Sequence, residues 1–119
     1  MLLNITNHPS RYWSNAQLKA AEEFGSVVDL PFPQIRMDMS NEQINKLVDA
    51  YLIQILCYED PVVLCQGEFV FTYRLIVLLK EHHIPVVACQ GNLEREELQD
   101  ENQNTIKQTV YRFARFLEY

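Results

Sequence analysis

Four short apolar runs, each followed by polar or turn-forming residues, divide the chain: residues 1–6, 27–30, 61–65 and 85–89. Runs of this length without polar alternation are typical of strands buried on both faces, as in a parallel sheet covered by helices. The pattern therefore predicts a mostly parallel sheet built from these four segments.

Helical signals fill the gaps between the runs. Ser14 and Ser40 are each followed three residues later by glutamine, the capping-box signature of a helix start. They predict helices over 14–24 and 40–55, the second with apolar residues at the i, i+3, i+4, i+7 spacing. Residues 68–82 are apolar nearly all round and end in basic residues, which predicts a third helix.

An internal echo connects two of the predicted strands. Residues 61–67 (PVVLCQG) recur as residues 85–91 (PVVACQG), with the third predicted helix between them. Strand, helix and strand at this spacing form a right-handed crossover between parallel strands. The tail 107–119 alternates in the manner of a strand, and we favour a strand antiparallel to the fourth over a terminal helix. Residues 92–104 are acidic and amide-rich, which predicts a mobile loop.

The fold class that results is α/β: a single domain, residues 1–119, with a Rossmann-like three-layer sandwich and a sheet of about five strands. The expected strand order is 2-1-3-4-5, with the last strand antiparallel.

Net charge, the absence of apolar targeting segments and the spacing of the cysteines each argue against certain classes of function. Sixteen acidic against ten basic residues give a net charge of −6, which argues against electrostatic coating of duplex nucleic acid. The first residues lack the pattern of a signal peptide and no window has transmembrane length, so we expect a cytoplasmic protein that does not bind membranes. Cys57, Cys65 and Cys89 lack metal-ligand spacing, which predicts buried, reduced thiols, no metal and no cofactor.

The candidate binding region lies where the strand order reverses. In an open parallel sheet, ligands bind beyond the carboxyl ends of the strands at this reversal, here between the first and third strands. That places residues 6–10 beside Gln66, Gly67 and Glu68, with Gln90 and Gly91 one strand further along. Glycine at both strand ends allows close approach to the backbone, and exposed amides at the start of the following helix favour a phosphate.

The loop after the first strand supplies neutral hydrogen-bonding groups on Thr6, Asn7 and Ser10, a proton-transfer group on His8 and a cation on Arg11. The alternative is that Asn7 and Ser10 only satisfy turn amides and that His8 shapes the loop.

Other polar side chains have structural alternatives that we favour. Glu68 and Thr72, four apart on the third helix, could face the crevice together, although Glu68 is better explained as a first-turn acid than as a general base. Tyr12 and Trp13 could stack on a base, but a tryptophan just before a helix more often packs on the core. No nucleotide-hydrolase or metalloprotease motif is present.

Several motifs together resemble a known family, the small stand-alone CRISPR-associated proteins of type III systems, which are similar to the CARF sensor domain. The resemblance covers most of the chain and rests on these segments: Leu3–Ser10, Trp13-Ser14, Ala20-Ala21, Val28–Pro33, Gln66–Thr72 and Tyr111–Phe116.

The resemblance implies that a symmetric homodimer binds cyclic oligoadenylate, a small cyclic RNA messenger. It also implies metal-independent cleavage of the ring, in which a ribose 2′-hydroxyl attacks its own phosphate. The implied catalytic residues are His8, Ser10 and Arg11, and the implied ligand-binding residues are Thr6, Asn7, Gln66, Gly67, Glu68, Thr72 and Gln90.

Two alternatives stay open on the residues alone. The chain could hold the messenger without cutting it, as a sensor or sponge, because no constellation demands catalysis. It could also be an unrelated small α/β interaction protein whose crevice is an ordinary loop junction.

Overall fold

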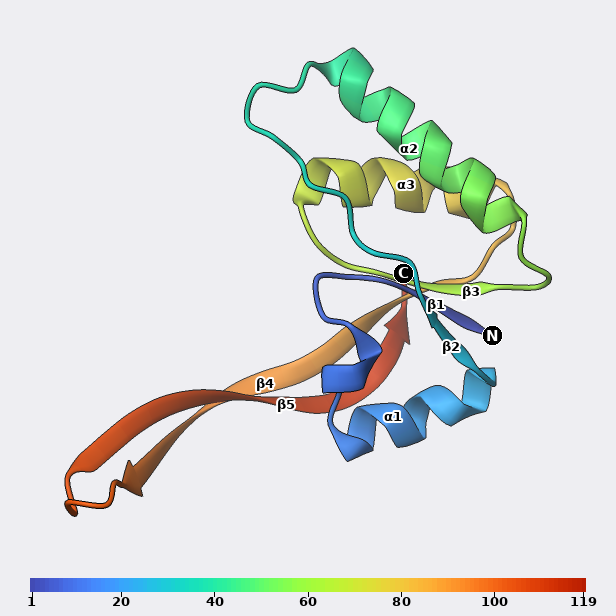
Figure 1. Ribbon diagram of the computed structural model, residues 1–119. Coiled ribbons are helices and arrows are strands. Elements are labelled where there is room, and N and C mark those ends of the chain that lie inside the picture. Colours follow the sequence, from blue (N-terminus) through green and yellow to red (C-terminus); the bar gives the residue numbers. More distant parts are fainter.

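The computed structural model describes all residues from 1 to 119 (Figure 1). Its strands are β1 (Leu2–Ile5), β2 (Val27–Asp29), β3 (Val62–Cys65), β4 (Val86–Gln99) and β5 (Thr105–Glu118). Its helices are α1 (Asn15–Ala21), α2 (Asn41–Leu56) and α3 (Phe69–Glu81), with short 3-10 turns at Ser10–Tyr12 and Glu22–Phe24.

The sheet confirms the expected fold class. Its order is β2-β1-β3-β4-β5, with the first four strands parallel and β5 antiparallel to β4. The strand order therefore reverses at β1, which lies between β2 and β3.

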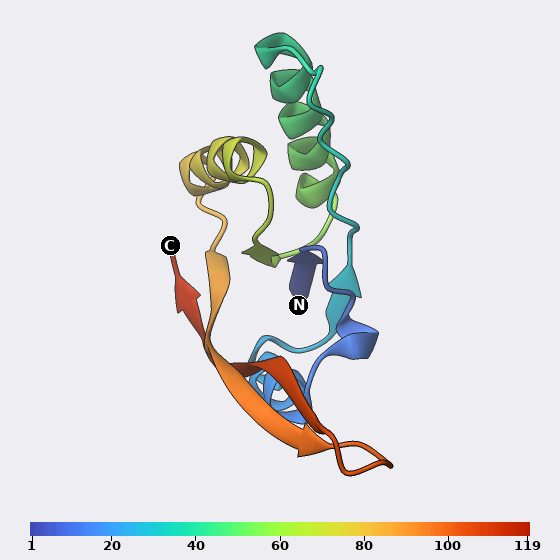
Figure 2. The same cartoon turned by 90° about the vertical axis from the view of Figure 1, so that its left-hand side faces the viewer.

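Helices cover both faces of the sheet. Figures 1 and 2 show α1 on one face and α2 with α3 on the other. Successive side chains of β1 point to opposite faces of the sheet. Leu2 packs in the core under α1, while Leu3 and Ile5 pack in the larger core under α2 and α3. None of the helices is long and apolar enough to span a membrane.

The predicted helix starts are present. Ser14 Oγ accepts a hydrogen bond from Gln17 N, and Ser40 and Gln43 form both hydrogen bonds of a capping box. The first helix is shorter than expected, because its α-helical part ends at Ala21 and continues as the second 3-10 turn. Cys57, predicted to be buried, is exposed at the carboxyl end of α2, and all three thiols are free.

The predicted loop over residues 92–104 is wrong for residues 92–99, which belong to a strand, and only residues 100–104 form a turn. β4 continues to Gln99, and β5 pairs with it from Thr105 in an antiparallel hairpin that projects away from the rest of the molecule (Figure 1). The segment forms a strand without apolar side chains in the core because its backbone pairs with residues of the tail. Arg112 also forms ion pairs with Glu94 and Glu96 across the two strands. We call the outer part of this hairpin, Gly91–Phe113, the arm.

Two phenylalanines on α3 provide a test of the packing. Phe71 is fully buried and contacts Phe32 and Tyr51 edge to face, with ring centroids 5.3 Å apart in both pairs, whereas Phe69 is 90% exposed. Phe71→Ala should lower the free energy of unfolding by about 3–5 kcal/mol in urea denaturation, because it leaves a cavity. Phe69→Ala is the matched control and should change it by less than about 0.5 kcal/mol. Equal losses in the two variants would contradict this packing.

Candidate functional site

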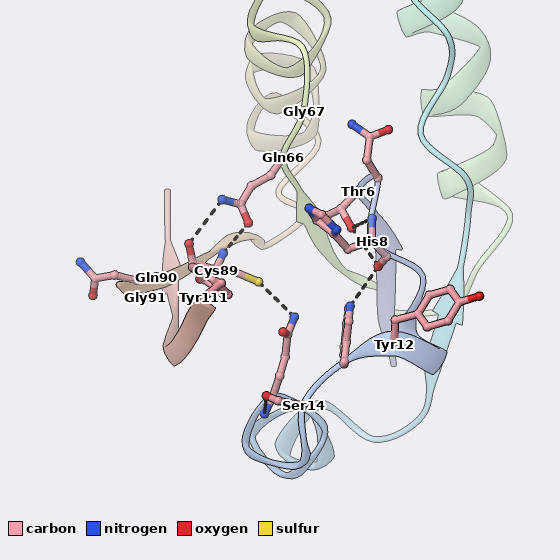
Figure 3. A pocket seen from close by; sticks show the side chains of 13 residues that line it. Thr6, His8, Tyr12, Ser14, Gln66, Gly67, Cys89, Gln90, Gly91 and Tyr111 are labelled. Carbon is pink, nitrogen blue, oxygen red and sulfur yellow. Dashed lines mark hydrogen bonds between the residues drawn. The ribbon is translucent and has the colours of Figure 1, made fainter. Parts of the chain in front are cut away.

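A cleft of about 680 Å³ opens at the carboxyl ends of β1 and β3 and along β4, where the strand order reverses (Figure 3). Its walls come from the loop after β1, the start of α1, the end of β3 and the hairpin. The residues that line it are Thr6, Asn7, His8, Tyr12, Trp13, Ser14, Gln17, Gln66, Gly67, Cys89, Gln90, Gly91 and Tyr111.

A buried amide holds the loop after β1 in place. Asn4 is 1% exposed, and its Nδ2 donates hydrogen bonds to the carbonyl of His8 (2.9 Å) and to Oδ1 of Asp29 (2.8 Å). Its Oδ1 accepts one from the hydroxyl of Thr6 at 2.8 Å. Both N–H donors and the oxygen of this side chain are directed at the loop and at β2, so the loop has one preferred shape.

Asp29 completes the support of the loop from β2. Its carboxylate accepts hydrogen bonds from the backbone N and the hydroxyl of Ser10, at 3.1 and 2.8 Å. Partial burial raises the pKa of Asp29, but the hydrogen bonds from Asn4 and Ser10 and the charge of Arg11 outweigh it, and the pKa lies below its ordinary value.

Gln66 connects the end of β3 to β4. Its Oε1 accepts a hydrogen bond from Cys89 N at 2.7 Å, and its Nε2 donates one to the carbonyl of Cys89 at 3.3 Å. The side chain thus replaces a backbone pair of the parallel ladder just where β3 has ended (Figure 3). Both groups of the amide are used, so Gln66 shapes the cleft.

Aromatic residues form two of the walls. Trp13 is buried against Phe116, with ring centroids 6.2 Å apart, and its Nε1 donates to the carbonyl of His8 at 2.9 Å. Packing on the core is therefore its role, as the sequence favoured. Tyr111, on β5, lies near Cys89 and Gln90, while His8 and Tyr12 lie on the other side of the view in Figure 3.

The two glycines of the echo, Gly67 and Gly91, line the cleft, but a side chain at either position would clash with another part of the protein. A Cβ at Gly67 would clash with the ring of Phe32, and a Cβ at Gly91 would clash with the carbonyl of Arg112 and the ring of Tyr111. Both positions are small because neighbouring parts of the protein occupy the space. Close approach of a ligand is not what requires glycine there.

Six of the ten predicted site residues come together in the cleft: Thr6, Asn7, His8, Gln66, Gly67 and Gln90. Ser10 and Arg11 do not line it. The hydroxyl of Ser10 is bound to Asp29, and the guanidinium of Arg11 lies 4.7 Å from the centre of the Tyr12 ring.

Glu68 and Thr72 do not line it either. The carboxylate of Glu68 caps α3 by accepting hydrogen bonds from Val70 N (3.0 Å) and Phe71 N (2.7 Å). These two amides belong to the helix start that was expected to favour a phosphate, and the protein's own carboxylate already occupies part of that position. Thr72 is buried in α3.

Sequence reasoning missed several lining residues, among them Ser14, Gln17, Cys89 and Tyr111, whereas it placed Gly91 beside Gln90 at the cleft, where the structure has it. The echo could have indicated Cys89, because it is the neighbour of Gln90. Tyr111 could not be placed, because its position depends on the pairing of a segment predicted as a loop.

The cleft is electrically neutral over most of its surface. None of its lining residues is Asp, Glu, Lys or Arg. Burial raises the pKa of Cys89 to about 11 and raises that of Tyr111, so the thiol and the phenol stay protonated at neutral pH. His8 is the lining residue with an imidazole, a side chain that can both donate and accept a proton.

One family model, that of the Uncharacterized protein MJ1673 family, matches residues 1–117. No curated protein and no solved structure matches the chain.

Gln66 gives a direct test of the strand connection. Gln66→Leu removes both hydrogen bonds to Cys89, so we expect a loss of about 1–3 kcal/mol in the free energy of unfolding and faster amide exchange at Cys89. Gln66→Glu keeps the acceptor for Cys89 N and should retain slower exchange at that amide than the leucine variant. Unchanged exchange in both variants would contradict the proposed connection.

Asp29 gives a pH-dependent test. Because its folded pKa lies below the unfolded value, its stabilisation is present above the unfolded pKa and is lost as pH falls through the folded pKa. Wild type should therefore exceed Asp29→Asn in free energy of unfolding at pH 7, and the difference should shrink below about pH 4. Denaturation at both pH values measures it, and a difference that does not change with pH would contradict the prediction.

Proposed function

We propose that this chain, which belongs to the Uncharacterized protein MJ1673 family, binds a cyclic oligoadenylate by taking an adenosine unit of the ring into the cleft. The observation that carries the proposal is the cleft itself: neutral, rich in amides and aromatic rings, and placed at the reversal of the strand order. The resemblance described above supports the identity of the ligand.

The size and chemistry of the cleft suit a nucleoside. Its volume of about 680 Å³ falls within the range of about 300–1,000 Å³ that is typical of small-molecule sites. Adenine needs a flat apolar surface for its faces and hydrogen-bonding groups at its edge, and Tyr111, Asn7 and the hydroxyl of Ser14 are of these kinds.

The charge distribution around the cleft favours phosphates of such a ring at its rim. No lining side chain carries a cation, and Glu68 already caps the start of α3. Arg11 lies just outside the cleft, over Tyr12, and is the nearest guanidinium along the chain to His8. A phosphodiester linkage would therefore remain near Arg11 while the base enters.

Cleavage of the ring is the second candidate function, and His8 is the residue that favours it. Its side chain lines the cleft and is followed by Arg11 at the rim, so a base and a cation would flank a linkage held there. Metal-independent attack by a ribose 2′-hydroxyl needs in-line positioning and these two aids. Ser10 is not part of this arrangement, because its hydroxyl is bound to Asp29.

Labelled cyclic tetra- and hexa-adenylate test the binding function. Wild type should retain one of the rings, and Tyr111→Ala should weaken binding by about 5- to 100-fold, because one aromatic stacking surface is lost. Tyr73→Ala is the matched control, since Tyr73 is an exposed tyrosine on α3 remote from the cleft lining. Failure of wild type to bind either ring, or equal weakening in both variants, would overturn the proposal.

The products of the same incubation test cleavage. Linear oligoadenylate formed without added metal, and lost in His8→Ala while the ring is still bound, is the result expected of a ring nuclease. A ring recovered intact after prolonged incubation would exclude cleavage and leave a sensor or sponge. A chain without affinity for any adenine nucleotide would favour an unrelated interaction protein.

A further inference from the structure

The two edges of the sheet differ greatly. One edge is β2, which has three residues, and the other is β5, which has fourteen. A short edge strand gives other chains little to pair with, whereas a long one presents a row of unpaired backbone groups. The sequence of β5 contains no proline, one of the residues that natural proteins use to block an edge.

The arm also lacks a third strand and any helix that covers its faces. Figure 1 shows no helix or strand other than β4 and β5 along it, and a two-stranded ribbon is only marginally stable in water. Apolar side chains are exposed on both of its faces: Leu93 (74%) and Tyr111 (46%) on one, Leu98 and Ile106 on the other. A further strand beside β5 would stabilise this ribbon.

We propose that a second copy of this chain supplies that strand, by antiparallel pairing of β5 with β5 around Thr109. Gly91 pairs with Phe113 and Gln90 with Arg115, so Ala114 is an extra residue that interrupts the regular edge. The uninterrupted part is Thr105–Phe113, and Thr109 is its midpoint. A two-fold axis there pairs Thr109 with its own copy, a favourable cross-strand pair.

This register brings no like charges together. Symmetry around Thr109 places Lys107 opposite Tyr111 and Ile106 opposite Arg112, so no two basic side chains face each other. Arg112 is already paired within its own copy with Glu94 and Glu96. Because isologous pairing buries the same edge in both copies, it closes the long edge of each and leaves open only the short edge at β2.

The pairing would also add a residue of the second copy to the cleft. The role given to that residue rests on the proposed function. Lys107, Thr109 and Tyr111 alternate with the other residues of β5 and share the face that forms the cleft wall. Lys107 of the partner subunit would lie directly across from Tyr111. It would give a cleft with no charged lining residue a cation for the phosphates of the ring.

Sedimentation of the full chain tests the interface. Wild type should have twice the 14.0 kDa mass of one chain. Thr109→Lys places two lysines opposite each other on the axis and should give monomers, while Gln99→Lys, on β4 of the same arm, should leave the dimer intact. A monomeric wild type, or a dimer indifferent to Thr109→Lys, would overturn the proposal.

Cross-linking tests the register. In a Cys57→Ala background, which removes the exposed thiol, Thr109→Cys should form an intermolecular disulfide, because directly opposed antiparallel residues lie about 4.5–5.5 Å apart. Arg95 pairs with Thr109 on β4, so Arg95→Cys lies two strand spacings further from its own copy than Thr109→Cys and should not cross-link. Equal cross-linking of both would contradict the register.

Ligand binding separates this inference from the proposed function. Lys107→Ala should stay dimeric and bind the cyclic oligoadenylate about tenfold more weakly, since one charge-assisted contact is lost. If wild type forms the β5 dimer and binds no ring, the proposed function fails and the interface stands. If wild type binds the ring as a monomer, the interface is overturned and the proposed function stands.

Discussion

The cleft depends on one buried amide. Asn4 lies in the middle of β1, surrounded by core residues, where an unpaired amide would cost several kcal/mol. Its three hydrogen bonds reach Asp29, Thr6 and His8, so the requirement to satisfy a buried polar group fixes β1, β2 and the loop between β1 and α1 relative to one another. The position of His8 follows from the core.

Much of the fold could be predicted because the signals were local. Ser14 and Ser40 mark helix starts through hydrogen bonds to backbone three residues away, and the echo of residues 61–67 in 85–91 identifies two strands of the same kind. The strand order then follows from the short connections of the crossover.

The errors concern features that depend on contacts distant in sequence. Residues 92–99 have few apolar anchors, so their strand structure comes from pairing with the tail, which no local pattern shows. Ser10 was assigned to the cleft because its hydroxyl is close in sequence to His8, but Asp29, nineteen residues away, binds it. Glu68 could be a helix-capping acid or a general base, and its hydrogen bond to the backbone at the start of α3 shows that it caps the helix.

The arm and the cleft are connected through Gly91. The ring of Tyr111 and the carbonyl of Arg112 occupy the space where a side chain at Gly91 would lie, at the position where the ladder between β4 and β5 shifts register. The same close packing therefore sets the direction in which the arm leaves the body and the position of the cleft wall. Since Tyr111 belongs to both, a partner that pairs with the arm would also act on the wall of the cleft, and by reciprocity a ligand in the cleft would act on that pairing.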